Sequence, residues 1–429
     1  MCASVRLDTI DRAITDIAAG RAVVVLDAAD RENEGDLVFA AAASTPKLMG
    51  LMIRYTSGIV CAPTDDETLN RLAIPMMTAD NHDRMGTAFT VSVDALHGIT
   101  TGISAFDRSE TVRTLSDPNA EPGHLVRPGH VFPLRARRGG VLERAGHTEA
   151  AVDLMKLAGQ PPVGVIGELV NDDGTVQRGI QCRKFADEHG LALISIEDLI
   201  AYRKRRDSWV RHVATTRMPT AYGDFTAYGY RDLITGTEHL TLVKGALGES
   251  DSVLTRLHSE CLTGDVFGSN RCDCGEQLHD SLRRIADVGR GVLIYLKGHE
   301  GRGIGLIDKL RAYEQQDGGL DTVDANLKLG LPVDSRDYTA GAQILNHLGV
   351  RKIQLLTNNP DKVRSLAESG ILVEERLPLL PTPTAHNFPY LTTKRTRMGH
   401  HLPEFTNAPE TEKRSALPVD RLPHAVGDC

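Results

Sequence analysis

Short apolar segments alternate with helical patterns along the first half of this chain, and the same alternation returns in the second half. Residues 8–19 have a helical pattern that Gly20 ends as a C-terminal stop, and a Val-rich strand is expected directly afterwards, at 21–26. Strands alternating with helices favour α/β or α+β domains built on mixed sheets. Further elements expected in the first half are strands at 37–43, 88–93 and 163–169 and a helix at 180–189.

One helix of the second half is marked at both ends. Asn359 is a good N-cap, Pro360 suits the first helical position, and Gly370 suits the end. Together the two halves predict two mixed-sheet α/β (α+β) domains in tandem, each with helices packed on its sheet. The other elements expected in the second half are strands at 291–296 and 353–356 and a helix at 304–316.

The stretch 201–219 changes composition and marks the expected domain boundary. It is rich in Arg and Lys and holds the only tryptophan of the chain, Trp209. The basic run 203–206 is typical of a solvated helix end, where positive charge complements the helix dipole; a nucleic-acid contact is the weaker interpretation. A chain of 429 residues is also too long for one ordinary domain. The expected division is 1–205, 206–400 and a disordered tail at 401–429, rich in Pro, Glu, Thr and Lys.

Net charge and hydropathy narrow the range of partners. The formal net charge is −8 and aromatic residues make up 4% of the chain, so neither nucleic acid nor a membrane is an expected partner. No apolar run approaches the roughly 18 residues of a membrane span. The N-terminus lacks the basic and apolar stretches of a signal peptide. These features predict a cytoplasmic protein, in which phosphorylated small molecules can bind where Arg, Lys or metal ions gather.

Residues 30–36 bring four carboxylates and an arginine together between two expected strands. Carboxylates this close repel one another unless a cation, a proton or solvent relieves the repulsion. A hard cation such as Mg²⁺ needs only one or two protein carboxylates when substrate oxygens complete its shell. The loop is therefore a candidate metal site, and a solvated acidic turn is the alternative interpretation.

Two histidines lie in glycine-containing turns beside arginines, at 127–130 and 144–150. The guanidinium, backbone N–H and hydroxyl groups of such turns can bind a phosphate. His130 and His147 are candidates for proton transfer or metal ligation, although a single histidine is more often structural. Glu168, at the end of an apolar segment, is either a base or a charge at the end of a strand.

Residues 8–202 resemble 3,4-dihydroxy-2-butanone 4-phosphate synthase, on the motifs 30–36, 101–105, 127–134, 146–150 and 168–174. The resemblance implies conversion of D-ribulose 5-phosphate to 3,4-dihydroxy-2-butanone 4-phosphate and formate, with Mg²⁺ or Mn²⁺ and no organic cofactor. It assigns metal binding to Glu32 and His147, and catalysis to His130 and Glu168. The substrate contacts that it implies are Arg31, Glu32, Asp36, Arg144, Gly146, His147 and Thr148.

This half departs from the family in two places. Residues 28–29 are alanines where the family usually carries more acid, and Gly167 stands where cysteine is common. Neither change removes a residue assigned above, but Gly167 deletes a side chain beside the expected base, Glu168. One alternative is therefore that only the second half of the chain is active.

Three cysteines of the second half lie close together in the sequence, Cys261, Cys272 and Cys274. Three thiolates make a soft, roughly tetrahedral site that suits Zn²⁺ and leaves the fourth position to water. Zinc would lower the pKa of that water and provide hydroxide near neutral pH. A closed structural site, with His258 as the fourth ligand, is the alternative.

A glycine-rich turn at 298–305 follows an expected strand and opens a helix. Backbone N–H groups in this position bind phosphate, although the turn lacks the lysine of a P-loop. Glu300 lies within the turn. Its carboxylate can accept hydrogen bonds from the N1–H and N2–H₂ groups of guanine.

Residues 211–397 resemble GTP cyclohydrolase II, on the motifs 256–275, 300–306, 311–313, 321–323, 334–337 and 357–360. The resemblance implies hydrolysis of GTP to 2,5-diamino-6-ribosylamino-4(3H)-pyrimidinone 5′-phosphate, formate and pyrophosphate, with Zn²⁺ on the three cysteines and Mg²⁺ accompanying GTP. It makes Arg336 the nucleophile towards the α-phosphate, Asp334 the proton acceptor and Tyr313 a participant in ring opening. The GTP contacts that it implies are Arg256, Glu260, Gln277, Glu300, Gly301, Arg302, Thr322, Thr357 and Lys362.

Several alternatives stay open in the second half. Guanidinium remains protonated in proteins, so a transition-state clamp is the physical alternative for Arg336. Lys297 stands where arginine is common, which keeps the charge but loses the planar fork. A non-catalytic GTP or zinc sensor would be favoured by loss of Arg336, Tyr313 or a zinc ligand, and all of these are present. The resemblance to both families also implies a homodimer.

Overall fold

The computed structural model describes residues 5–28, 31–248 and 252–405, which form two compact units. The chain passes from the first unit to the second between Trp209 and Val210, and the segment Leu233–Thr235 counts with the first unit. The predicted boundary at 205–206 coincides with the last residues of helix α7 (Ile196–Arg206). Of the predicted tail at 401–429, residues 406–429 lie outside the described residues.

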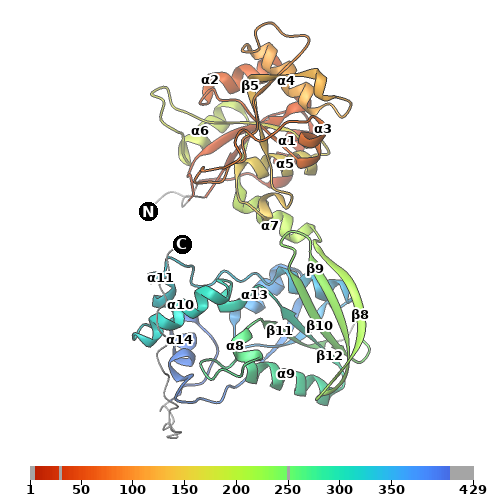
Figure 1. Cartoon of the computed structure of the whole chain (residues 1–429), viewed down its shortest axis with the longest axis vertical. Helices are drawn as coiled ribbons and strands as arrows, with labels where there is room; N and C mark the ends of the chain where they lie inside the picture. Colours follow the sequence, from red (N-terminus) through yellow and green to blue (C-terminus); the bar gives the residue numbers. More distant parts are fainter. Residues whose placement is uncertain (1–4, 29–30, 249–251, 406–429) are drawn as a thin grey trace, which may run out of the picture. The chain divides into compact units, whose positions relative to one another are not determined.

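The first unit is a central mixed sheet with helices on both faces (Figure 1). Its strand order, over the residues that are described, is β4-β5-β3-β6-β2-β1-β7. Strand β1 runs antiparallel to β2 and parallel to β7, so parallel and antiparallel pairs share one sheet. The strands are β1 (Val23–Leu26), β2 (Gly35–Ala40), β3 (Cys61–Thr64), β4 (Val93–Ala95), β5 (Leu125–Arg135), β6 (Gly164–Glu168) and β7 (Ala192–Ser195).

Successive residues of the central strands are buried on opposite faces of this sheet. Val24 and Phe39 pack with α2, α3, α4 and α6, whereas Val23 and Val38 pack with α1, α5 and α7. Because both faces are covered, β1 and β2 are continuously buried rather than alternately exposed. The helices are α1 (Ile10–Ala18), α2 (Pro46–Tyr55), α3 (Asp66–Arg71), α4 (Ala105–Ser116), α5 (His147–Leu157) and α6 (Ile180–His189), besides α7.

The strand predicted at 88–93 is wrong. Within this segment only Val93 belongs to a strand, β4. Thr90 donates its backbone N–H to Pro133, whereas Val91 donates to Pro75. Because successive residues bond to different segments, no continuous ladder forms there. The segment predicted at 37–43 is a strand as far as Ala40 and then a 3₁₀ turn.

The second unit contains another mixed sheet, in the order β14-β13-β11-β12-β10-β9-β8 among its described residues. Strands β8, β9 and β10 are antiparallel neighbours, and β11 runs parallel to both β12 and β13. The strands are β8 (Val210–Thr220), β9 (Gly223–Asp232), β10 (Glu238–Lys244), β11 (Val253–Ser259), β12 (Gly291–Leu296), β13 (Lys352–Leu356) and β14 (Leu372–Leu377).

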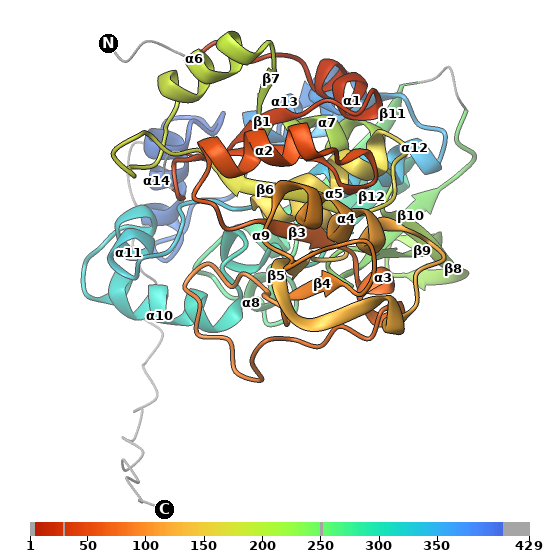
Figure 2. The ribbon, with the colours of Figure 1, turned by 90° about the horizontal axis from the view of Figure 1, so that it is seen from above.

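Helices also cover both faces of this second sheet. Ile285 of α9 packs with Leu293 on one face, and Gly341 of α12 lies so close to Leu257 on the other that an added Cβ would be 2.7 Å from it. Helices α10, α11 and α14 lie side by side in both ribbon views (Figures 1 and 2). The helices are α8 (Leu262–Asp265), α9 (Cys274–Val288), α10 (Leu306–Asp317), α11 (Thr322–Lys328), α12 (Thr339–His347), α13 (Pro360–Glu368) and α14 (Phe388–Met398).

Both predicted mixed-sheet folds are confirmed, and so is the helix marked at both ends. The Asn359 side chain accepts the backbone N–H of Asp361, Pro360 opens α13, and Gly370 follows with φ of +81°. Among the described residues, every helix is too short or too polar to serve as a membrane span.

Candidate active sites

The acidic loop of the first unit joins β1 to β2 and is folded around Asp27. The two carboxylate oxygens of Asp27 accept the backbone N–H groups of Glu32 and Glu34 at 3.0 and 2.9 Å. Arg31 donates to Asp27 at 3.1 Å and also pairs with Glu32. Asp27 therefore shapes the loop, a role that the sequence motif did not reveal. Asp30 lies outside the described residues.

His147 opens α5 and reaches into this loop. Its Nε2 lies 3.1 Å from the carbonyl oxygen of Val25. Because a carbonyl only accepts, Nε2 carries the proton and Nδ1 keeps its lone pair. Nδ1 lies 3.9 Å from Glu32 and 3.8 Å from Asp36. Burial lowers the pKa of His147 to about 4, so the ring is neutral at physiological pH and able to bind a metal.

Carboxylates crowd around this histidine with little to neutralise them. Ligand atoms of Asp27, Glu32 and His147 all lie within 4.8 Å of one another. Asp36 is buried and its Oδ1 accepts no hydrogen bond from the described residues. Burial, and then the charge of Glu168, raise the pKa of Asp36 well above its usual value. A bound divalent cation would relieve this repulsion, so the residues fit a hard metal ion.

Glu168 lies opposite Asp36, on the neighbouring strand β6. Its carboxylate accepts a 2.6 Å hydrogen bond from the hydroxyl of Ser57. The preceding Gly167 is closely covered by helix α2 and the residue after it: an added Cβ would lie 2.7 Å from Sδ of Met52 and 3.0 Å from Oγ1 of Thr56. The place of a side chain at 167 is therefore filled from α2, and Glu168 is held by Ser57.

His130 is oriented by a buried aspartate that sequence reasoning missed. Asp94 accepts both Nδ1 and the backbone N–H of His130, at 2.6 and 2.8 Å. Gly102, from the motif at 101–105, leaves room for the pair, because an added Cβ would lie 2.2 Å from the Asp94 carboxylate. Among the described residues, no hydrogen bond or ion pair joins this pair to His147 or Glu32.

Arg144 is held by hydrogen bonds to residues inside and outside its own motif. Arg144 donates to Glu149 at 2.6 Å and to the carbonyl of Met85 at 3.0 and 3.2 Å. Gly146 permits this close approach, since an added Cβ would lie 2.3 Å from the guanidinium. Thr148 is buried in the first turn of α5.

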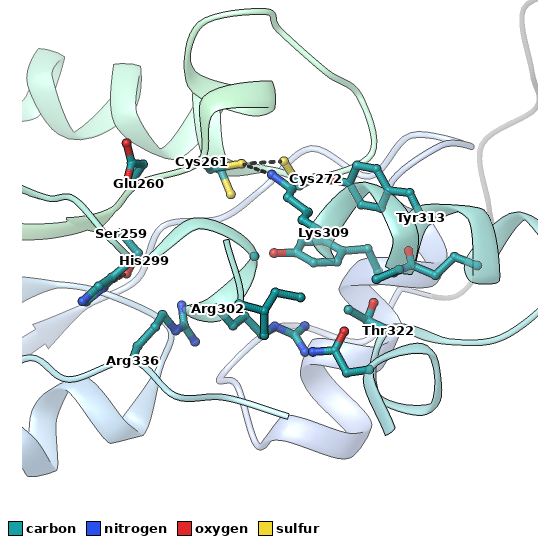
Figure 3. A pocket seen from close by; sticks show the side chains of 17 residues that line it. Ser259, Glu260, Cys261, Cys272, His299, Arg302, Lys309, Tyr313, Thr322 and Arg336 are labelled. Atoms are coloured by element: carbon teal, nitrogen blue, oxygen red, sulfur yellow. Dashed lines mark hydrogen bonds between the residues drawn. The ribbon is translucent and has the colours of Figure 1, made fainter. Parts of the chain in front are cut away.

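The three cysteines of the second unit converge. Cys261 follows β11 and Cys274 opens α9, with Cys272 just before it. The sulfurs of Cys261 and Cys272 are 3.7 Å apart (Figure 3). The sulfurs of all three cysteines lie within 4.8 Å of one another. His258 is not part of this group: its Nε2 lies 3.0 and 3.1 Å from the carboxylate oxygens of Asp265. The described side chains therefore offer three thiolates, which suit Zn²⁺ with an open position.

Lys309 sits beside this group and was missed in the sequence. Its ammonium donates to Sγ of Cys261 at 3.2 Å and to Glu300 at 2.5 Å. The second oxygen of Glu300 accepts the backbone N–H of Leu262 at 2.6 Å. The buried carboxylate expected to read guanine is thus fixed in position by a cation from α10. A buried lysine within a helix carried no motif signal.

A pocket in two parts brings most of the predicted GTP contacts together (Figure 3). In this view Cys261 and Cys272 lie in the upper part, and Arg302 and Arg336 lie below them. Both guanidinium Nη atoms of Arg302 are buried and have no partner among the described residues. Predicted residues that line the pocket are Glu260, Gly301, Arg302, Tyr313, Thr322, Arg336 and the three cysteines in one part, and Arg256, Gln277, Thr357 and Lys362 in the other.

Two predicted residues, Asp334 and Glu300, do not line either part of this pocket. Asp334 accepts Nε of Arg336 at 2.9 Å and forms a second bond with the same guanidinium. Although burial opposes it, this pairing raises the pKa of Arg336 above its usual value. Glu300 lines a separate cleft with Glu260. Lining residues that sequence reasoning missed include His299, Lys309, Tyr390, Lys394 and His400.

Comparison with known proteins identifies one enzyme family in each half of the chain. Residues 11–202 match the family model of 3,4-dihydroxy-2-butanone 4-phosphate synthase, and residues 211–378 match that of GTP cyclohydrolase II. Riboflavin biosynthesis protein RibBA of Nocardia farcinica is 58% identical, with 92% of this chain and 96% of that protein covered. RibBA of Salinispora arenicola is 56% identical, with 96% and 98% covered.

Among solved structures, RibBX, a two-domain 3,4-dihydroxy-2-butanone 4-phosphate synthase from A. baumannii, is similar over 86% of this chain and 99% of its own, with a TM-score of 0.65 and 33% identity. The chain is thus a two-domain enzyme, a lyase followed by a hydrolase. It belongs to the family of bifunctional riboflavin biosynthesis proteins, which join 3,4-dihydroxy-2-butanone 4-phosphate synthase to GTP cyclohydrolase II.

Proposed function

We propose that both domains are active, the first on D-ribulose 5-phosphate and the second on GTP, each through the residues described above. The observation that carries this proposal is the pair of unlike metal-binding groups. One is a neutral histidine among carboxylates, and the other is three converging thiolates. A sensor of GTP or zinc would need neither the acidic group nor the Glu168–Ser57 and His130–Asp94 pairs.

In the first domain, Glu32 and His147 would hold Mg²⁺ or Mn²⁺, with Asp27 close enough to assist. When bound, the cation supplies charge stabilisation to the sugar oxygens as a carbon-bound proton is lost. Glu168 is placed to accept and return protons, held by Ser57. His130 acts as a second proton-transfer group, and its hydrogen bond with Asp94 fixes the ring. Arg31, Asp36 and residues 144–148 are the proposed substrate contacts.

In the second domain, Cys261, Cys272 and Cys274 would hold Zn²⁺. When bound, zinc supplies an activated water at neutral pH, as required for attack on a purine ring carbon. Tyr313 lines the same part of the pocket and is the proposed participant in ring opening. Glu300, held by Lys309, is placed at the neighbouring cleft as the proposed guanine-reading carboxylate.

We assign Arg336 to a clamp on the α-phosphate rather than to a nucleophile. Its two hydrogen bonds with Asp334 fix the planar fork and keep the guanidinium charged. A charged guanidinium has no lone pair to offer, but it stabilises developing negative charge on phosphate oxygens. Asp334 then serves to orient Arg336. Mg²⁺ accompanying GTP would share the phosphate charge.

The decisive experiment incubates the purified full chain with ribulose 5-phosphate plus Mg²⁺ and, separately, with GTP. Formate is measured in each reaction. Both reactions are expected to release formate, and a zinc chelator should silence only the second. Formate from GTP alone would instead establish a chain with one active half. GTP hydrolysis that resists thorough zinc removal would refute the three-thiolate site.

We further propose a homodimer that acts in the cytoplasm on small molecules only. The support is the resemblance to the two enzyme families and the net charge of −8, which offers no general attraction to nucleic acid. Light scattering coupled to size-exclusion chromatography tests the oligomeric state, because a dimer of 46.6 kDa chains is readily told from a monomer.

A further inference from the structure

Helix α14 lies beyond the residues that match the GTP cyclohydrolase II family model, which end at 378. It nevertheless contributes to the pocket of the second domain. Tyr390 lines both parts of the pocket, and Lys394 and Met398 line the part with Arg256. A segment outside the family-model match, although inside the resemblance over 211–397, therefore forms part of the wall of the pocket expected to hold GTP.

Three kinds of contact hold α14 and the residues after it against the domain. Leu391 is fully buried. Arg397 forms ion pairs of 2.5 and 2.9 Å with Asp321 and Asp324 at the start of α11, next to the expected GTP contact Thr322. Beyond the helix, His401 donates its backbone N–H to Asn358 at 2.9 Å. The helix is thus anchored to the same elements that carry other pocket residues (Figures 1 and 2).

Lys394 connects α14 to two of the expected GTP contacts through a buried chain of hydrogen bonds. Its ammonium donates to Oδ1 of Asp273 at 2.7 Å, and the Asp273 side chain is 0% exposed. The other oxygen of Asp273 accepts Gln277 at 2.6 Å. Gln277 in turn accepts the guanidinium of Arg256 at 2.7 Å. Lys394 is the ion-pair partner that the described residues give to Asp273, so it supports the orientation of all three.

The pocket holds more positive charge than its own carboxylates neutralise. Arg256, Arg302, Arg336, Lys362 and Lys394 line the part beneath α14. Asp273 and Asp334 pair with Lys394 and Arg336, whereas both Nη atoms of Arg302 lack a partner among the described residues. Burial, Arg256, Arg336 and Lys394 lower the pKa of Lys362 well below its usual value. A polyphosphate would relieve this crowding.

We propose that α14 is a wall of the GTP site, in which Tyr390 contacts the bound nucleotide and Lys394 positions Gln277 and Arg256 through Asp273 for the triphosphate. This inference rests on the proposed GTP-hydrolysing function and adds two residues to it. Lys394 is a positioning residue, because it acts through Asp273. The helix is part of the substrate site, although the family motif ends before it.

Full-length variants at Lys394 separate positioning from simple loss of structure. Lys394→Met is expected to raise KM for GTP by a factor of about 10 to 100, with a smaller effect on kcat, because the buried Asp273 loses its charged partner. Lys394→Arg should restore KM to within about threefold of the unaltered chain, since it can pair with Asp273 again. Arg395→Ala is the matched control on the same helix, because Arg395 pairs at 3.5 Å only with Glu404 among the described residues.

Tyr390→Leu is expected to raise KM for GTP while zinc content stays at one ion per chain. A KM for Lys394→Met and for Tyr390→Leu equal to that of Arg395→Ala would overturn the proposal. A loss confined to kcat in Lys394→Met, without rescue by Lys394→Arg, would overturn it too. An unaltered chain that releases no formate from GTP would instead remove the proposed function on which the inference rests.

A measurement on the unaltered chain avoids any question of misfolding. Hydrogen exchange is followed with and without guanosine 5′-(α,β-methylene)triphosphate. In this analogue a methylene group bridges the α- and β-phosphates, so pyrophosphate is not released. Slower exchange across residues 388–398 on binding, with no change across α6 of the first domain, is the expected result. Unchanged exchange in α14 while the residues after β12 become protected would contradict the proposed wall.

Discussion

The two active sites carry opposite imbalances of charge. In the first domain, burial and the neighbouring Glu32 raise the pKa of Glu34 to about 7, and Asp36 is affected in the same direction. In the second domain, burial and neighbouring cations lower the pKa of Lys362. Each domain has therefore gathered the charge opposite to that of its expected ligand, a divalent cation in one and a polyphosphate in the other.

The difference shows how little overall charge says about a bifunctional chain. The net charge of −8 sums the charged residues of the whole chain, and it describes neither the acidic site nor the basic one. The metals that the two sites suit differ in the same way. Carboxylates with a neutral imidazole suit a hard ion bound together with substrate oxygens, whereas three thiolates suit zinc. If the two sites are as independent, and as different, as this comparison implies, damage to one should leave the other active.

The largest expected effect is the loss of a zinc ligand. Cys272→Ser should lower GTP hydrolysis on the order of a thousandfold or more, because a neutral hydroxyl is a poor substitute for a thiolate. Formate release from ribulose 5-phosphate should stay within about twofold, since the residues of that site all belong to the first domain. Elemental analysis should show less zinc per chain. Cys182→Ser, whose thiol is buried in the core of the first domain, is the control.

Equal loss of both reactions in Cys272→Ser would break the comparison, because it would mean that the two sites depend on one another. Full zinc content with lost GTP hydrolysis would place the cysteine in catalysis rather than in metal binding.

The next largest effect is expected at the acidic site. Glu32→Gln keeps the shape of the side chain but removes a charged ligand, so Mn²⁺ binding and the ribulose 5-phosphate reaction should both weaken by about 100-fold. GTP hydrolysis should be unchanged. Electron paramagnetic resonance of free Mn²⁺ measures the affinity, and the exposed Glu188→Gln serves as control. Unaltered Mn²⁺ affinity would remove Glu32 from the metal site.

A smaller effect is expected from Arg336→Lys. The substitution keeps the positive charge but loses the two-pronged pairing with Asp334, and kcat for GTP should fall by about 10- to 100-fold. As a clamp, Arg336 forms no covalent bond with the substrate. Rapid quenching with GTP labelled at the α-phosphate should therefore leave the unaltered chain unlabelled. A labelled guanidinium would restore the nucleophile interpretation.

Residues within one local pattern could be placed from the sequence itself: the acidic loop, the cysteines and the cap of α13. The link from Glu32 to the distant His147 came from the resemblance to the synthase family and not from a local pattern. Asp94 and Lys394 could not be found this way, because each acts on a partner far along the chain, His130 and Asp273. Neither has a motif of its own, and only the packed fold shows the contact.

The strands were predictable to a similar extent, and the strand prediction that failed did so for a related reason. Continuous apolar runs such as β1 and β12 were predicted, since a strand buried on both faces needs no special partner pattern. The segment 88–93 alternates apolar and polar residues from Phe89 to Val93, which is also typical of a strand, but its backbone groups bond to two different segments. Hydrogen-bond partners are a property of the tertiary fold, so propensity alone cannot identify them.

The smallest expected effect concerns Gly167, one of the two places where this chain departs from the usual pattern of the synthase family. An alanine there would place Cβ 2.7 Å from Sδ of Met52 and 3.0 Å from Oγ1 of Thr56. We expect Gly167→Ala to destabilise the first domain by about 1–3 kcal/mol, because α2 must shift to make room. Thermal unfolding of the full chain, followed with and without Mg²⁺, measures the change.

The double variant Gly167→Ala, Met52→Ala decides whether crowding is the cause. If α2 fills the place of the missing side chain, shortening Met52 should recover part of the loss, so the two substitutions should be less than additive by about 0.5–3 kcal/mol. The ribulose 5-phosphate reaction of the double variant should match that of the unaltered chain, since Glu168 keeps its bond to Ser57. Strict additivity would show that the space at 167 is not shared with α2, and that Gly167 acts on Glu168 by some other route.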